Sequence, residues 1–139
     1  MNVMRLGILL SRFQLSAPAS PKGIEAFEER VNFTLPADYR EFLGFADGGE
    51  GFIGPHSYAM LWKVEELIPF NKEYQVEEYA PGLLLFGSSG GGEAFAFDVR
   101  EPSETPVVSV PFIGMDLNDI VQLAETFDGF LEYLAQQTQ

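Results

Sequence analysis

The amino-acid sequence predicts an α+β fold, in which helices pack against a central, mostly antiparallel β-sheet. The chain has 139 residues, the size of one ordinary domain. Apolar residues make up 46% of it, far more than in disordered chains. The local patterns run from helices through strands to a closing helix, and this order favours an antiparallel sheet over repeated βαβ units.

The N-terminal segment differs in composition from the rest of the chain. Residues 1–23 contain three basic residues and no acidic ones, and we expect a strand or arm followed by a linker there, with the α+β domain over residues 24–139. Ser20 and Pro21 predict the start of the first helix, because serine caps a helix and proline is tolerated in its first turn. The apolar face of this helix consists of Ile24, Phe27 and Val31.

A second helix is predicted to begin near Pro36. Its amphipathic stripe consists of Tyr39, Phe42, Leu43 and Ala46. The sequence Asp47-Gly48-Gly49 is expected to end this helix, because glycine accepts the left-handed conformation that follows many helices.

The middle of the chain predicts a series of short strands. They are Tyr58–Trp62, Leu83–Phe86, Glu93–Val99 and Val107–Val110. The glycine-rich segment Gly87–Gly92 joins two of them, which predicts an antiparallel hairpin. The segment Val64–Ile68 is expected to be helical, and Pro69 should limit this helix to one or two turns. A closing helix is predicted from the stripe Leu123, Phe127, Phe130, Leu131 and Leu134.

The chain is strongly acidic, with 21 Asp and Glu against 8 Lys and Arg and a formal net charge of -13. Nucleic acid is an improbable ligand, because binding a phosphate backbone requires a basic surface. A basic protein partner suits this charge, and a surface adapted for solubility is the simpler explanation. No basic residue follows Arg100, whereas these acids do: Glu101, Glu104, Asp116, Asp119, Glu125, Asp128 and Glu132.

The sequence also limits the compartment and the chemistry. It contains no cysteine, so disulfides, thiolate zinc sites and cysteine nucleophiles are excluded. No stretch approaches the roughly 18 apolar residues of a membrane-spanning helix. The apolar run Leu6–Leu10 is too short for a signal peptide, and Arg12 interrupts it before any cleavage-like sequence. We therefore expect an uncleaved cytoplasmic protein without a membrane partner.

Two glycine motifs resemble catalytic or cofactor-binding loops. The segment Gly49–Gly54 matches G-x-G-x-x-G, but a dinucleotide site needs a strand before it and a helix after it. A helix is predicted before this segment and a strand after it. The segment Gly87–Gly91 matches the G-x-S-x-G nucleophile elbow, which requires a following helix and a later histidine. The only histidine, His56, precedes Ser89, so a flexible hairpin loop is the better interpretation.

Metal and cofactor sites are not predicted either. The segment Asp116–Asp119 resembles the start of a calcium loop, but Val121 and Phe127 stand where that loop needs glycine and glutamate. The paired glutamates of the chain are adjacent in sequence, and adjacent residues do not face one another on a helix or strand. We expect no catalytic residues, no metal ligands and no cofactor.

Several segments together resemble the SUKH superfamily, the group of cell-wall assembly regulators and bacterial immunity proteins. The leading segment is Phe33-x-Leu35-Pro36-x-x-Tyr39-x-x-Phe42-Leu43, followed by Asp47-Gly48-Gly49. The middle segment is Trp62-x-x-Glu65-Glu66-Leu67 with Asn71, and the hairpin runs from Phe86-Gly87 to Phe97-Asp98. The closing helix is similar over Ala124–Leu134. Asp47 departs from the pattern, because the family more often has asparagine there.

This resemblance implies a single α+β domain and, in bacteria, frequent service as an immunity protein that neutralises a toxin. Our leading hypothesis is a non-enzymatic protein that occludes a basic toxin acting on nucleic acid. The alternatives are a regulatory or scaffold module of the cell-wall assembly regulator type and a hydrolase that uses Ser89 and His56. The candidate partner-binding residues are Asp47, Glu50, Tyr58, Trp62 and Glu93.

Overall fold

The computed structural model describes residues 3–101 and 103–138. They form one seven-stranded sheet in which the strands lie side by side in sequence order and each adjacent pair is antiparallel. This arrangement confirms the predicted α+β class. The strands are β1 (Phe13–Leu15), β2 (Gly49–Ile53), β3 (Ser57–Leu61), β4 (Leu83–Ser88), β5 (Glu93–Asp98), β6 (Val107–Pro111) and β7 (Val121–Ala124).

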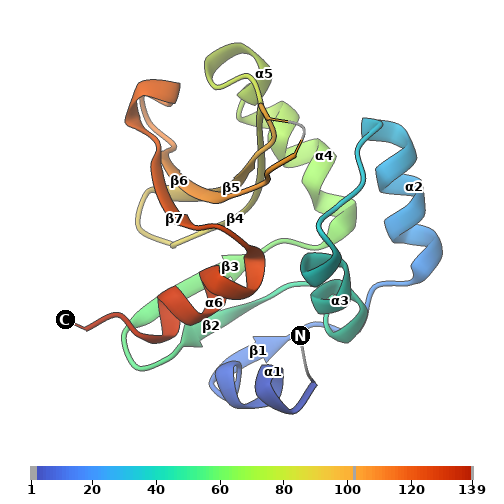
Figure 1. Ribbon diagram of the computed structural model, residues 1–139, viewed down its shortest axis with the longest axis vertical. Coiled ribbons are helices and arrows are strands. Elements are labelled where there is room, and N and C mark those ends of the chain that lie inside the picture. The colour runs from blue at the N-terminus through green and yellow to red at the C-terminus, as the bar shows by residue number, and fades with distance from the viewer. Residues whose placement is uncertain (1–2, 102, 139) are drawn as a thin grey trace.

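Helices precede, interrupt and follow these strands. They are α1 (Val3–Leu9), α2 (Pro21–Val31), α3 (Ala37–Phe45), α4 (Val64–Glu73), α5 (Val76–Tyr79) and α6 (Phe127–Ala135), with a 3₁₀ turn at Leu117–Asp119. Figure 1 shows the sheet in two parts, with β4–β7 curled in the upper half and β1–β3 extended below them. The two parts are joined narrowly, because β3 and β4 pair only through Met60 with Ser88 and Leu61 with Gly87.

An aromatic core lies where α3 and α6 meet the sheet. The fully buried ring of Tyr39 contacts Phe97 and Phe127 edge-on, with centroid distances of 5.0 Å each. Phe130 makes similar edge-on contacts with Phe86 at 5.5 Å and with Phe95 at 4.8 Å. Such ring pairs add to the hydrophobic stabilisation of a core. α3 and α6 therefore fix one face of β4 and β5.

The helix α4 is tied to the edge of β4 that β3 leaves unpaired. The side-chain amide of Asn71 donates to the carbonyl of Leu85 at 2.9 Å, and its oxygen accepts from the Leu85 backbone amide at 2.9 Å. Asn71 thus replaces the backbone groups of a neighbouring strand, which satisfies a buried strand edge. This contact orients α4 alongside the sheet.

The first 23 residues contain a strand, as one form of the prediction had it, and also a helix that was not predicted. Within the described part of this segment, α1 and β1 are formed, and Leu6, Leu10 and Phe13 are buried in the hydrophobic core. β1 pairs with β2 in register, so this segment completes the edge of the sheet. The apolar run Leu6–Leu10 forms the end of α1 and the residue after it, and Leu6 and Leu10 pack into the core.

Two local predictions are wrong in detail. α4 continues through Pro69 to Glu73, and both Pro69 and Glu65 are exposed, so the carbonyl that loses its helical partner can bond to water. Leu123 belongs to β7 and not to the closing helix, which begins at Phe127 after a Thr126 cap.

The end of α3 also differs from the prediction. This helix ends at Phe45, and Ala46 already has an extended backbone. The left-handed glycine comes two residues later, at Gly48 with φ of 78°. The glycine therefore serves the approach to β2 and not the helix end.

Candidate functional site

One face of β1–β3 exposes a row of large side chains. They belong to Gln14, Glu50, Phe52, Tyr58 and Met60, and we call this surface the open face. On the opposite side of the same strands, Ile53, Ala59 and Leu61 are buried. Because residues paired across a sheet share a face, the alternation along β2 and β3 brings these five side chains together.

The centre of the open face is an ordered polar and aromatic cluster. The Tyr58 hydroxyl donates to Oε2 of Glu50 at 2.5 Å, and this bond raises the pKa of Tyr58. The ring of Phe52 meets Tyr58 edge-on at 5.4 Å. Both rings remain 37% exposed. The cluster is therefore held in place and still accessible to a partner.

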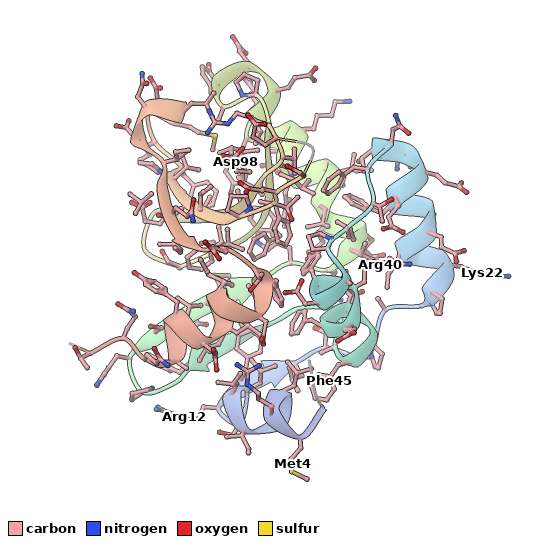
Figure 2. The ribbon with its side chains drawn as sticks, viewed as in Figure 1. Met4, Arg12, Lys22, Arg40, Phe45 and Asp98 are labelled. Carbon is pink, nitrogen blue, oxygen red and sulfur yellow. The ribbon has the colours of Figure 1, made fainter. Side chains whose placement is uncertain are left out.

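An arginine of the same chain already contacts this cluster. The guanidinium carbon of Arg12 lies 5.0 Å from the centre of the Phe52 ring. This distance is typical of a cation–π contact. Figure 2 shows Arg12 at the edge of the domain, beside α1 and β1.

A groove of about 530 Å³ runs between the open face and the start of α4. Glu50, Met60 and Trp62 line it from the sheet side, and Glu66 and Phe70 line it from α4. The Trp62 ring is 8% exposed and is held by edge contact with Phe70 at 4.8 Å and by stacking on Tyr74 at 6.2 Å. The groove thus combines two carboxylates with fixed aromatic walls.

Asp47 does not line this groove and has a structural contact. Its Oδ1 accepts from the backbone amide of Val64 at 2.8 Å, which caps the first turn of α4 from 17 residues upstream. Burial raises the pKa of Asp47, while the Val64 hydrogen bond opposes that shift. An asparagine side chain could accept the same hydrogen bond. The presence of Asp47 instead of the expected asparagine therefore preserves the cap.

Glu93 lies on the other side of the sheet. Its neighbour Ala94 pairs with Ser88, and Ser88 pairs with Met60 of the open face. Successive residues of a strand point to opposite faces. Of the five predicted contact residues, the structure therefore brings together Glu50, Tyr58 and Trp62, and separates Asp47 and Glu93 from them.

The sequence matches a known protein family. The sequence profile of the SMI1/KNR4 family (SUKH-1) matches residues 18–133, which include every strand after β1 and all of the open face except Gln14. The chain belongs to this family. It is also 33% identical over 124 residues to the uncharacterized protein YnaB of Bacillus subtilis strain 168, covering 88% of this chain and 80% of that protein.

In this SUKH-1 chain, the glycines of the G-x-G-x-x-G motif allow two strands to pack closely. At Gly49, whose φ is 146°, an added Cβ would lie 2.4 Å from the carbonyl oxygen of Gln14. At Gly51, the same atom would lie 2.7 Å from the carbonyl oxygen of Arg12. These glycines allow β1 to approach β2 closely. A strand follows the motif, so it lacks the helix that a dinucleotide site requires.

The second glycine motif forms the hairpin between β4 and β5. The hydroxyl of Ser89 accepts from the backbone amides of Gly91 at 3.1 Å and Glu93 at 3.4 Å. A strand follows Ser89, in contrast to the helix of a nucleophile elbow. Across residues 3–101 and 103–138, no three His, Cys, Asp or Glu side chains are grouped to hold a metal ion. No helix within these ranges is long and apolar enough to cross a membrane.

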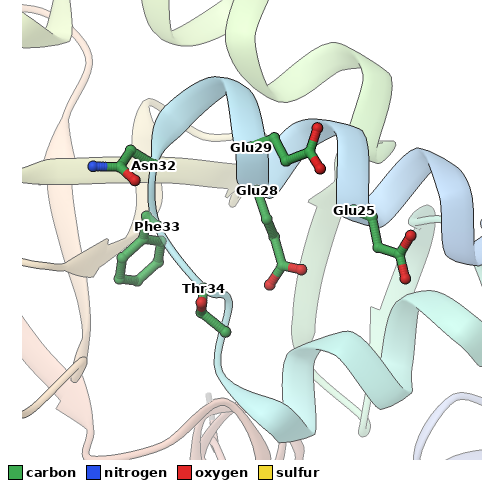
Figure 3. A pocket seen from close by; sticks show the side chains of 6 residues that line it. All are labelled: Glu25, Glu28, Glu29, Asn32, Phe33 and Thr34. Atoms are coloured by element: carbon green, nitrogen blue, oxygen red, sulfur yellow. The ribbon is translucent and has the colours of Figure 1, made fainter.

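A second hollow, of about 360 Å³, carries negative charge on α2 (Figure 3). Glu25, Glu28 and Glu29 line it. Glu28 has a structural contact, because its Oε2 accepts from the Leu35 amide at 2.7 Å and lies 3.5 Å from Nε of Arg40. This carboxylate holds the connection between α2 and α3.

Sequence reasoning missed Phe52, Met60, Glu66 and Phe70. Met60 lies in a strand that the sequence predicts, but its exposure on the same face as Glu50 depends on the pairing of β2 with β3. The strand that contains Phe52 was hidden because Gly49 and Gly51 weaken the appearance of a strand in the sequence. Glu66 and Phe70 lie four residues apart on α4, a spacing that places them on one helix face.

Proposed function

We propose that this protein is a non-enzymatic immunity protein that binds and occludes a basic toxin through its open face. The observation that carries the proposal is the exposed Phe52, Tyr58 and Met60 cluster beside carboxylates on a chain of net charge -13. Aromatic residues and methionine are enriched where proteins bind one another. Family membership supports the same role, because immunity proteins occur in the SUKH superfamily.

The charge of the chain supports a basic partner that acts on nucleic acid. Such a toxin needs a basic surface to bind a phosphate backbone. An acidic inhibitor is steered toward that surface, with association rates raised by about 10- to 1,000-fold at low salt. Binding would place the inhibitor over the surface that the toxin uses for its substrate.

The experiment is a growth rescue with the genes that flank the one encoding this protein. Each neighbouring reading frame that ends in a basic domain is expressed alone and together with this chain. We expect toxicity alone, rescue on co-expression, and a stoichiometric complex whose association slows steeply with added salt. Rescue without a complex, or a toxin product consumed by this chain, would contradict a non-enzymatic mechanism.

A second candidate function is a regulatory or scaffold module that gathers other proteins. The observation that favours it is a separate apolar spot on the outer side of α1, where Met4 is 76% and Ile8 is 71% exposed. Figure 2 shows Met4 pointing away from the domain. A scaffold would bind two proteins at once, so sedimentation of a ternary complex distinguishes it from an inhibitor with one partner.

A further inference from the structure

The groove beside the open face has the composition of a site for a guanidinium group. Glu50 and Glu66 enter it from β2 and α4, and Trp62 and Phe70 provide aromatic walls. A planar guanidinium binds carboxylates through paired hydrogen bonds and also stacks on aromatic rings. A lysine ammonium matches this combination less well, because it is compact and strongly hydrated.

Both carboxylates are positioned by hydrogen bonds within the protein. Oε2 of Glu50 accepts from the Tyr58 hydroxyl, and Oε1 of Glu66 accepts from the Lys63 backbone amide at 2.9 Å. Among the described residues, the other oxygen of each carboxylate accepts no hydrogen bond. Each group therefore has an oxygen available for a partner.

The contact between Arg12 and Phe52 shows that the open face accepts a guanidinium. This Arg12–Phe52 contact lies on the same surface as Glu50, because Phe52 and Glu50 are two residues apart on β2. Lys63 also lines the groove and is exposed, so it is the positive charge that an incoming cation meets.

We propose that this groove receives an arginine side chain from the basic protein partner. The inference rests on the proposed function and names the group that the open face recognises. Glu50 and Glu66 would pair with the guanidinium, which would lie against the wall that Phe70 and the edge of Trp62 form together. Lys63 would oppose the incoming cation, so its removal should tighten binding.

The test uses the fluorescence of Trp62, which is the only tryptophan of the chain and a wall of the groove. The full chain is titrated with hexaarginine and, separately, with hexalysine at low salt. The test variant is the Glu50→Gln, Glu66→Gln pair. The control is the Glu25→Gln, Glu29→Gln pair in the hollow of Figure 3, which removes the same amount of charge.

We expect hexaarginine to change the Trp62 emission saturably and to bind more tightly than hexalysine. The Glu50→Gln, Glu66→Gln pair should weaken binding by about tenfold or more, the loss expected for a charge-assisted hydrogen bond. The control pair should bind nearly as the original chain does, and Lys63→Ala should bind more tightly. A control pair that weakens binding equally, or hexalysine that binds as well as hexaarginine, would overturn the proposal.

The result is independent of the growth rescue. Rescue by the intact chain together with a failed hexaarginine titration would refute the arginine groove and leave the immunity function standing. A positive titration without rescue by any neighbouring gene would support the groove and refute the toxin as its partner.

Discussion

The two halves of the sheet differ in what covers them. In β5, four consecutive residues from Ala94 to Phe97 are buried, so both faces of the strand are covered. In β2 and β3, exposed residues alternate with half-buried or buried ones, and the exposed side chains form the open face. Burial on both faces is the arrangement of a core, whereas a strand pair with one accessible face can present side chains. The difference indicates that β4–β6 form the core, whereas β2–β3 leave one face accessible, as the proposed partner binding requires.

The largest expected effect is a difference in stability between two alanine substitutions, one at a phenylalanine in each half of the sheet. Phe97 is fully buried, and Phe97→Ala should lower the free energy of unfolding by about 3–5 kcal/mol. Phe52 is 37% exposed, and Phe52→Ala should cost less than about 1 kcal/mol. Urea unfolding followed by Trp62 fluorescence measures both. Equal losses would show that the open face is part of the core.

Gly48 connects α3 to the open face and should tolerate no side chain. Its φ is 78°, and an added Cβ would lie 2.3 Å from the carbonyl oxygen of Leu61. Gly48→Ala should lower the free energy of unfolding by about 2–3 kcal/mol. The matched control is Gly44→Ala on α3, where the added atom meets nothing within 4 Å. We expect that control to stabilise the protein by up to about 1 kcal/mol.

Asp47 should matter for stability and not for partner binding. Asp47→Ala removes the acceptor for the Val64 amide and should cost about 1 kcal/mol. Asp47→Asn retains an acceptor. Because burial raises the pKa of Asp47, its ionisation opposes folding as pH rises through that pKa. We therefore expect Asp47→Asn to be at least as stable as the original chain at neutral pH, and thermal unfolding of both variants provides the check.

The smallest effect concerns an ion pair at the end of β5. Nη2 of Arg100 lies 2.8 Å from Oδ2 of Asp98, and this contact lowers the pKa of Asp98 below its ordinary 3.8. The pair therefore contributes stability above pH 3.8 that is lost as pH falls through the lowered pKa. Because Arg100 is partly exposed, the contribution should stay below about 1 kcal/mol. Comparing acid unfolding of Asp98→Asn with that of the original chain tests this, and identical acid midpoints would contradict it.

The fold was largely predictable from apolar periodicity. The stripe of α3 and the alternation across the β4–β5 hairpin indicate elements whose side chains do form the core. β2 was missed because two of its five residues are Gly49 and Gly51, whose purpose appears only when β1 lies against them. Leu123 continues the helical period by coincidence, and tertiary pairing with β6 places it in a strand.

The candidate site was predictable only in part. Glu50, Tyr58 and Trp62 were identifiable as an acid and aromatic residues in a weakly charged segment. Their proximity was not, because it depends on the register between β2 and β3. The role of Asp47 as a helix cap depends on a contact across 17 residues, which no local pattern contains.

The central claim is that the open face binds the partner. The most direct test uses the purified complex between this chain and the toxin that the growth rescue identifies. The dissociation constant of that complex is measured for two charge-reversal variants of this chain. Glu50→Lys changes the open face, and Glu78→Lys makes the same change at an exposed position of α5. We predict a loss of about 100-fold or more for Glu50→Lys, because like charges meet at the interface, and a loss of only a few-fold for Glu78→Lys. Equal losses would show that net charge alone drives binding and would contradict the account.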